Sequence, residues 1–478
     1  MKELNKETVN KPELPVKILQ FGEGNFLRAF VDWMIDKANE AGVMNHGVVA
    51  VQPIPGESPT YKIFKDQDCM YHVYLEGIKD KKPLKEVRLV KSLVDLINPY
   101  TDYEVYKNLF LSPELEMIIS NTTEAGIRYE EGDDLKALPP KSFPAKMTAL
   151  LYERYKKFNG DPNKGLLIIC CELIEDNGST LREYVLKHAK YNKLEQGFID
   201  WVEKSCHFYD TLVDRIVPGF PRENIKEIQE EIGFNDNLVV KGEYFHVWAI
   251  GGDPIIKEKF PLDKAGLNVL FMDDIKDFRA KKVRILNGSH TAMVPVGLQM
   301  GCETVMDAFN TPEIEKYINE MVAREVLPVI NDDPAELKIF AAKILERFYN
   351  PYLKHYLKDI ALNSISKWET RDYPTVYDNY KKLGKDAKLT TFSFAALLVL
   401  YSGKSEVKFT PNDTAEFVEF IQSTFNANDI KGWVSGIVNN KKMWNENFAE
   451  IPQFIDEVSA DVKKILDKGM KAALKEII

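Results

Sequence analysis

The first half of the chain alternates short apolar runs with amphipathic segments. In the segment after the first apolar run, Phe26, Phe30, Trp33 and Met34 share one helical face, and Gly42 stands where a helix would end. The pattern therefore predicts a parallel sheet with crossover helices. Its expected strands span residues 16–21, 48–52, 117–121 and 165–171.

After about residue 270 the pattern changes to successive helical periods. Runs of β-branched residues become rare, and proline or glycine separates the segments, as at Pro351 and Gly403. We therefore expect an α/β protein with two domains. An amino-terminal domain with a parallel sheet, residues 1–270, should be followed by a mostly α-helical carboxy-terminal domain, residues 271–478.

Three features indicate a cytoplasmic protein. The longest apolar stretch, residues 392–401, reaches only about half of the roughly 20 residues of a membrane-spanning helix, so we expect a buried helix there and no membrane association. Residues 1–15 are polar and lack the apolar core of a secretory signal. The five cysteines are odd in number and have no C-x-x-C spacing, which favours reduced thiols over a disulfide framework or a zinc site. We expect no metal.

The charge of the chain restricts its ligands. Apolar residues make up 45% and charged residues 28%, which is typical of a soluble globular protein. The net charge of -10 repels nucleic acid, and it also repels anionic substrates and dinucleotides. An anionic ligand must therefore be bound by locally placed cations and backbone N–H groups. We expect a small molecule as partner, and the sequence leaves the oligomeric state open.

A G-x-G turn directly follows the first expected strand. Gly22 and Gly24 stand at a strand-to-helix turn, where a backbone must approach a pyrophosphate closely. Leu27 replaces the third glycine of the motif, and Gln52 rather than a carboxylate ends the second strand, so these residues leave the choice between NAD and NADP open. A turn needed for packing alone is the alternative. The expected cofactor contacts are Phe21, Gly22, Glu23, Gly24, Asn25 and Phe26.

A second candidate loop follows the strand expected at residues 117–121. It carries small polar residues at the carboxyl end of a strand, where ligands bind in open α/β sheets. Clusters of asparagine and threonine also cap helices, and this alternative stays open. The expected cofactor contacts in this loop are Asn121, Thr122 and Glu124.

One segment, residues 281–290, contains a lysine, an amide and an imidazole. On an ideal helix Lys282, Asn287 and His290 lie within an arc of about 140°, and Lys282 and His290 are about 12 Å apart along the axis. They can share a pocket but cannot touch unless the helix bends at Gly288. A surface lysine, a helix-capping amide and a core histidine are the alternative interpretations.

Ketone reduction needs residues of these types. Hydride addition leaves an alkoxide that must be protonated, and alcohol oxidation needs the reverse. A lysine whose pKa is lowered by burial, or by cations such as Lys281 and Arg284, can serve both directions. Lys282 is therefore the candidate general acid/base. Asn287 is a candidate donor to the developing oxyanion, and His290 a candidate to orient the lysine or a substrate hydroxyl.

Together these segments resemble the polyol-specific long-chain dehydrogenases, the mannitol dehydrogenase family. The resemblance rests on G-x-G-x-F-x-R at residues 22–28, the T-x-E loop through Glu124, VDRIVP at residues 213–218, and Lys282 with Asn287-Gly-x-His290. It continues through Asn350-Pro351 and the apolar segment near residue 395, so it covers nearly the whole chain. It implies a Rossmann-type domain and a helical domain, NAD as cofactor without metal, and Lys282 as the general acid/base with Asn287 and His290 as partners.

The resemblance also implies substrate contacts. In the VDRIVP motif, Asp214 is expected to reach a substrate hydroxyl and Arg215 to tie the two domains together. Lys367 and Arg371, at i and i+4 on an expected helix, match a region where family members place basic substrate contacts, and they suit a carboxylate. Solvent-facing charges are the alternative for this pair.

One departure from the family concerns the substrate. Polyol-oxidising members have a Cys-Asp-Asn sequence whose asparagine helps to hold the reacting oxygen. This chain has Cys171-Glu172-Leu173, and Leu173 cannot donate that hydrogen bond. The resemblance therefore implies reversible NAD-dependent reduction of D-tagaturonate to D-altronate in hexuronate catabolism. Fructuronate reduction and mannitol-type polyol oxidation are the enzymatic alternatives, and a dinucleotide-sensing binding protein is the non-enzymatic one.

Overall fold

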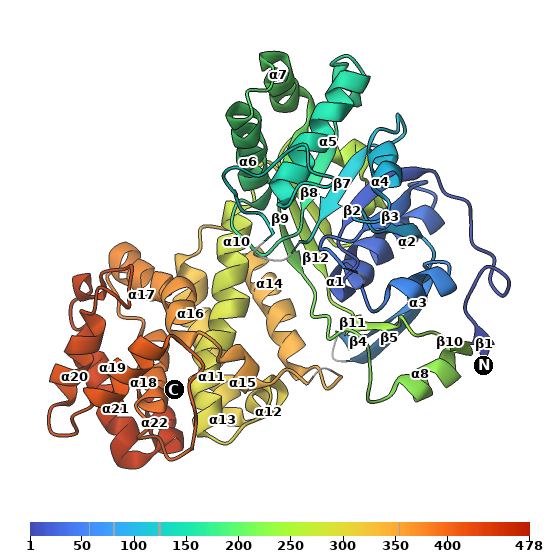
Figure 1. Ribbon diagram of the computed structural model, residues 1–478. Coiled ribbons are helices and arrows are strands. Elements are labelled where there is room, and N and C mark those ends of the chain that lie inside the picture. Colours follow the sequence, from blue (N-terminus) through green and yellow to red (C-terminus); the bar gives the residue numbers. More distant parts are fainter. Residues whose placement is uncertain (57, 80–81, 123–125, 353) are drawn as a thin grey trace. The chain divides into compact units, whose positions relative to one another are not determined.

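The computed structural model describes residues 1–478 except 57, 80–81, 123–125 and 353. The chain forms two compact units (Figure 1). The first comprises Met1–Gly77 and Pro83–Lys276, and the second comprises Ile78–Lys82 and Asp277–Ile478. The expected assignment of cofactor binding to residues 1–270 and of catalysis to residues 271–478 stays a prediction.

The first unit is built on an eight-stranded sheet of order β13-β12-β9-β8-β7-β2-β3-β6. All neighbouring strands are parallel except β12 and β9, which are antiparallel. The four expected strands are β2, β3, β7 and β8, with ends that differ from the prediction by at most two residues. The strands are β2 (Val16–Phe21), β3 (Gly47–Val51), β6 (Leu93–Ile97), β7 (Met117–Ser120), β8 (Leu167–Cys170), β9 (His207–Asp214), β12 (Val247–Gly251) and β13 (Val269–Met272).

Both faces of this sheet are buried. Because successive side chains point to opposite sides of each strand, a strand can contribute to the apolar cores on both faces. On β2, Ile18 packs into one apolar core with Phe30 and Trp33, whereas Leu19 packs into the other with Phe110. The strands β3, β7 and β8 alternate in the same way. The continuous apolar runs of the sequence are therefore explained by helices on both faces, and the predicted Rossmann-type unit is confirmed.

Helices and two small sheets complete the first unit. Gly42 ends α2 with φ of +71°, a conformation that glycine adopts without strain, as the helix-end prediction required. The helices are α1 (Asn25–Leu27), α2 (Trp33–Glu40), α3 (Tyr61–Asp66), α4 (Tyr103–Phe110), α5 (Phe143–Lys157), α6 (Asn177–Tyr191), α7 (Gln196–Ser205), α8 (Ile225–Ile232) and α9 (Ile256–Lys259). The small sheets pair β1 (Lys2–Glu3) with β10 (Phe234–Asn235), and join β11 (Val240–Glu243), β4 (Tyr71–Lys79) and β5 (Lys82–Val90) in that order.

The second unit is mostly helical, as predicted. Residues 392–401 lie in α18, which is buried along almost its whole length in the apolar core of this unit. Within the described ranges, no helix is long and apolar enough to span a bilayer. The helices are α10 (Lys276–Lys282), α11 (Ser289–Gln299), α12 (Val305–Phe309), α13 (Pro312–Met321), α14 (Pro334–Glu346), α15 (Leu357–Ile360), α16 (Ser364–Arg371), α17 (Tyr373–Asp378), α18 (Lys388–Tyr401), α19 (Ala415–Ser423), α20 (Ile430–Val438), α21 (Phe454–Lys468) and α22 (Met470–Ile477).

Candidate active site

The two loops expected to bind the cofactor meet at the topological switch point of the sheet. The strand β2 lies between β3 and β7, so the chain leaves β2 in one direction and later returns on its other side. The Asn121 amide donates to the Phe21 carbonyl at 3.0 Å, and Gly22 donates to the Val51 carbonyl at 3.0 Å. Gly22 has φ of +122°, and a Cβ there would lie 3.0 Å from the Asn121 carbonyl oxygen. Glycine is therefore required for this close approach.

The backbone of the turn, rather than its aromatic side chains, is available to a ligand. Phe21 is buried against Phe143 at a ring distance of 5.0 Å, and Phe26 stacks on Phe30 at 4.9 Å. Gly24 and Asn25 are exposed at the start of the helix, and Glu23 is half-buried. Exposed N–H groups at a helix start suit a pyrophosphate.

Buried polar side chains support this turn from behind. The Gln20 amide donates to the Gly22 carbonyl at 3.1 Å and to the Asp32 carboxylate at 3.4 Å, and the Tyr71 hydroxyl donates to the same carboxylate at 2.9 Å. Burial raises the pKa of Asp32 to about 7, although both hydrogen bonds act against this. Arg28 donates to the Asn25 side chain at 2.6 Å. The position of the turn is thus coupled to a buried, titratable carboxyl group.

Glu172 fixes the second loop. Its buried carboxylate accepts hydrogen bonds from the Thr122 amide at 2.9 Å, the Thr122 hydroxyl at 2.9 Å and the Ser120 hydroxyl at 3.1 Å. The neighbouring Leu173 is exposed. The expected cofactor contact Glu124 lies outside the described residues. Glu172 therefore orients the loop through its backbone, a role that sequence reasoning did not assign.

A cavity of about 870 Å³ opens at the carboxyl ends of β2 and β3. Phe21, Gln52, Thr122 and Lys146 are among its lining residues. The Gln52 side chain forms hydrogen bonds within its own loop: it donates to the Ile54 carbonyl at 2.8 Å and accepts from the Ser58 amide at 3.2 Å. Burial lowers the pKa of Lys146 to about 8. The cavity thus combines apolar walls with a buried amine.

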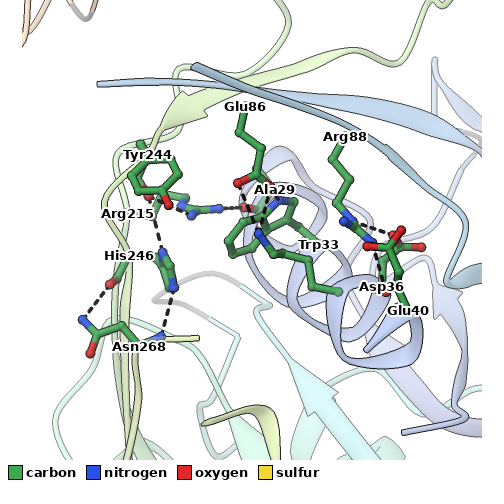
Figure 2. A network of polar contacts seen from close by, with 11 residues as sticks. Ala29, Trp33, Asp36, Glu40, Glu86, Arg88, Arg215, Tyr244, His246 and Asn268 are labelled. Atoms are coloured by element: carbon green, nitrogen blue, oxygen red, sulfur yellow. Dashed lines mark hydrogen bonds and ion pairs between the residues drawn. The ribbon is translucent and has the colours of Figure 1, made fainter. Parts of the chain in front are cut away.

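The expected role of Arg215 as a tie between the two domains stays a prediction, and the contacts that the structure describes for it lie in the first unit. Figure 2 shows Arg215 pointing to Ala29, beside Trp33. The guanidinium donates to the carbonyls of Ala29 at 2.5 Å, Tyr244 at 3.2 Å and Phe245 at 3.2 Å, and lies 4.2 Å from the Trp33 ring. All of these partners belong to the first unit, so Arg215 fastens the helix after the glycine turn to the end of the sheet.

Asp214 lies at the end of β9, opposite Val247 of β12, and is buried in the first unit. Its expected contact with a substrate hydroxyl stays a prediction.

In the second unit the candidate catalytic segment is helical throughout. A π-helical turn, Val283–Gly288, joins α10 to α11, and Gly288 itself has helical φ and ψ of -61° and -48°. Lys282 is half-buried at the end of α10. π-Helical turns change which side chains share a face and are frequent at functional sites. The ideal-helix geometry therefore does not apply to this segment.

The two other cations of the segment from Lys281 to His290 form ion pairs with carboxylates. Lys281 lies 2.5 Å from the Asp332 carboxylate, and Arg284 lies 2.6 Å from the Asp378 carboxylate. These pairs offset the positive charge that was expected to act on Lys282.

His290 is a buried, neutral imidazole. Its ring stacks on Phe348 at a centroid distance of 4.4 Å and meets the His355 ring edge-on at 5.1 Å. Burial lowers the pKa of His290 well below its ordinary value, and His355, Arg347, Arg371 and Lys282 lower it further. Lys282 and His290 are therefore close enough to interact electrostatically. The Asn287 side chain is half-buried and, among the residues that the structure describes, has no hydrogen-bond partner.

The helix α16 brings Arg371 to this segment. The Arg371 guanidinium donates to the Thr291 hydroxyl at 3.3 Å, and α16 packs against both the π-helical turn and α11. Gly288 permits this packing, because a Cβ there would lie 2.8 Å from the Asp372 carboxylate. Lys367, one turn earlier, donates to the Ile360 carbonyl at 2.8 Å. Arg371 thus joins Lys282 and His290, whereas Lys367 is engaged with the backbone.

Three residues of the candidate site were not found from the sequence. Glu172 follows β8 directly, and its place at the carboxyl end of a strand was the one available signal. Asp32 lies one turn after the glycine motif, within an apolar helical face. His355 lies in a loop with no motif of its own, and only the fold brings it to His290.

Comparison with known sequences identifies both units. Residues 16–264 match the mannitol dehydrogenase Rossmann domain, and residues 274–466 match the mannitol dehydrogenase C-terminal domain. The chain is 42% identical to the altronate oxidoreductase of Bacillus subtilis (strain 168), with all of this chain and 98% of the relative covered. It is 40% identical to the altronate oxidoreductase of Phocaeicola vulgatus, with both chains covered completely.

Two solved structures share the fold. A D-sorbitol dehydrogenase in substrate-free form superposes with a TM-score of 0.83 at 22% identity, over 99% of this chain and 100% of the other. The mannitol 2-dehydrogenase of Pseudomonas fluorescens superposes with a TM-score of 0.73 at 22% identity, over 99% of each chain. The family resemblance inferred from the motifs is confirmed, and the chain belongs to the mannitol dehydrogenase family.

Proposed function

We propose that this oxidoreductase catalyses the reversible, NAD-dependent reduction of D-tagaturonate to D-altronate. The observation that carries the proposal is its similarity, over the full length of both chains, to altronate oxidoreductases at about 40% identity. The Glu172-Leu173 sequence in place of the Asp-Asn of polyol-oxidising members also supports a substrate other than a simple polyol.

The first unit suits a dinucleotide cofactor. A Cβ at Gly22 would fill the space beside Asn121, and the exposed start of the helix at Gly24 and Asn25 offers N–H groups to a pyrophosphate. The residues proposed to hold the cofactor are Phe21, Gly22, Glu23, Gly24, Asn25, Phe26, Asn121, Thr122 and Glu124. When bound, NADH supplies the hydride that adds to the carbonyl carbon. NAD is proposed rather than NADP because the P. fluorescens mannitol 2-dehydrogenase was solved with NAD and D-mannitol.

The second unit supplies the proton chemistry. In the direction of reduction, the Lys282 ammonium gives a proton to the substrate oxygen as the carbonyl bond becomes a single bond, and the resulting amine regains a proton from water. Asn287 donates a hydrogen bond to the same oxygen while negative charge develops on it. The neutral His290 accepts or donates a hydrogen bond and so orients a substrate hydroxyl. In oxidation Lys282 starts as the amine and removes the hydroxyl proton.

Cations of α16 account for the substrate class. Arg371 is half-buried beside Thr291 and suits the carboxylate of a sugar acid, and Lys367 adds positive charge one turn away. Asp214 is proposed to bind a substrate hydroxyl.

A comparison of three ketones tests the proposal. The loss of NADH absorbance is followed with D-tagaturonate, D-fructuronate and D-fructose, and each is repeated with NADPH. We expect the highest kcat/KM with D-tagaturonate and NADH. Preferential turnover of fructose or fructuronate would overturn the substrate assignment. NADH binding without turnover of any ketone would instead indicate a binding protein.

A further inference from the structure

The residue that ends β3 directs its side chain into its own loop. In many dinucleotide-binding proteins a carboxylate just after the second strand of the fold binds a ribose hydroxyl. Here the Gln52 amide donates to the carbonyls of Ile54 and Gly56, and its oxygen accepts from the Ser58 amide. The first carboxylate after the strand in the sequence is Glu57, which lies outside the described residues. We therefore looked for a ribose-binding group on the other walls of the neighbouring cavity.

The cavity of about 870 Å³ adjoins the glycine turn on the side of β3. Phe21, at the end of β2, and Gln52, at the end of β3, both line it. A dinucleotide whose pyrophosphate lies on the turn would therefore extend its adenosine half into this cavity. Pro53, Pro99 and Tyr100 provide apolar walls that suit a purine ring. The Tyr100 hydroxyl donates to the Pro53 carbonyl at 3.1 Å, which fixes two of these walls relative to each other.

Lys146 brings an ammonium group to the wall of this cavity. It is buried in the first turn of α5, and its ammonium donates to the Lys141 carbonyl at 2.9 Å. The same group lies 5.5 Å from the centre of the Tyr100 ring, and both Lys141 and Tyr100 also line the cavity. An ammonium has three N–H donors. The described structure directs one of them to a carbonyl, so Lys146 can also donate to a ligand in the cavity.

The stability of the fold does not account for this lysine. Burial lowers the pKa of Lys146 to about 8, so the ammonium is less stable here than in water. A positive charge in the first turn of a helix is also unfavourable, because the helix dipole is positive at that end. Glu130 and Asp133 act in the opposite direction, but Glu130 is paired with Arg128 and Lys141, and Asp133 accepts two backbone N–H groups. A destabilising buried cation at a cavity is typical of a ligand-binding residue.

We propose that Lys146 binds the ribose of the cofactor's adenosine half, by donating a hydrogen bond from its ammonium to the 2′-hydroxyl oxygen in place of a strand-end carboxylate. The inference rests on the proposed function and deepens it, since it adds a cofactor residue from α5, outside the two loops that the sequence indicated. The direction of the hydrogen bond is reversed relative to a carboxylate, because the hydroxyl oxygen accepts from Lys146, whereas the hydroxyl would donate to a carboxylate.

The test compares two ligands that differ in one hydroxyl. ADP and 2′-deoxy-ADP both carry adenine and a diphosphate, and the 2′-hydroxyl is present in ADP alone. Calorimetric titration of wild type should give a Kd for ADP about tenfold lower than that for 2′-deoxy-ADP, the size expected for one hydrogen bond to a charged group. Lys146→Met removes the donor and keeps a side chain of similar length, so its two Kd values should agree within about twofold. Lys157→Met makes the same substitution at an exposed lysine of α5 and should retain the preference for ADP.

The preference is a ratio of two affinities of one protein, so a partly misfolded variant would lower both affinities and leave the ratio unchanged. Equal affinities in wild type, or a preference that survives in Lys146→Met, would overturn the inference. Loss of the preference in Glu57→Gln but not in Lys146→Met would assign the hydroxyl to that carboxylate and overturn it as well. The titration needs no turnover. A failure of the proposed function, seen as no oxidation of NADH with any ketone, is therefore distinguished from a failure of this inference.

Discussion

The cofactor end of the first unit and the catalytic segment of the second unit use their polar side chains in opposite ways. Glu172 and Arg215 direct their hydrogen bonds to the protein, mostly to backbone atoms. His290, His355 and Asn287 have polar side-chain atoms that, so far as the described chain shows, bond to no protein group. The first region is therefore organised to position backbone N–H groups, and the second keeps its side chains available.

This difference fits ligands of different kinds. A pyrophosphate can be held by backbone groups that any sequence supplies, so the side chains there serve to fix the turn. A sugar has hydroxyls at several positions and is recognised by individual side chains, so those side chains must stay unpaired until it binds. Substitutions in the two regions should therefore change different kinetic constants.

The largest effect is expected at Lys282. Lys282→Ala should lower kcat by about two to four orders of magnitude, because it removes the group that exchanges a proton with the substrate oxygen. The Kd for NADH should stay within about twofold, since the cofactor contacts are proposed to lie in the first unit. Stopped-flow turnover and fluorescence titration with NADH measure the two quantities.

Lys281→Ala is the matched control for this experiment. The neighbouring Lys281 is half-buried, and its ammonium is already paired with the Asp332 carboxylate. Its removal should leave kcat nearly unchanged. Similar losses of kcat in both variants would mean that the segment needs positive charge in general and not an acid/base at Lys282.

Glu172 should show the opposite pattern. Glu172→Ala leaves the Thr122 amide without an acceptor, and the loop then no longer keeps its place beside the glycine turn. We expect the Kd for NADH to rise about tenfold, whereas kcat at saturating NADH should change by less than about threefold. Fluorescence titration and steady-state kinetics give these values.

Glu172→Gln retains one oxygen acceptor of nearly the same shape and should restore most of the NADH affinity. If Glu172→Ala bound NADH as tightly as wild type, the loop would not depend on this carboxylate, and the contrast between the two regions would lose its main support.

The fold could be predicted because its signals are local. Alternating burial on β2 and the continuous apolar run of α18 are visible in the sequence, since each strand or helix carries its own period. The glycine turn and the segment from Lys282 to His290 could be found for the same reason, because each is contiguous.

The remaining parts of the site depend on distant pairs. Glu172 contacts Thr122, which lies 50 positions earlier in the sequence, and His355 contacts His290, which lies 65 positions earlier. No periodic pattern in the sequence indicates contacts at such separations. The hydrogen-bond partners of Arg215 could not be predicted, because a motif gives the residue without its partners, and those that the structure describes are carbonyls of its own unit. Motifs thus indicated the candidate site, and only the tertiary contacts showed which residues support it.

The smallest effect is expected at Asp32, whose buried carboxyl group supports the glycine turn and gains or loses its proton as the pH changes. Its pKa is about 7 in the folded protein and 3.8 as the ordinary value, because burial disfavours the carboxylate. The folded state therefore holds a proton that the unfolded chain has already lost, so that the contribution of Asp32 to stability falls as the pH rises from about 4 to about 7 and is constant above about 8.

Asp32→Asn removes this titration. The unfolding free energy of wild type minus that of the variant should fall by roughly 1 kcal/mol between about pH 6 and about pH 8, as measured by urea unfolding. Because all other groups titrate in both proteins, a difference that does not change with pH would show that Asp32 is ionised throughout, with its charge held by Gln20 and Tyr71.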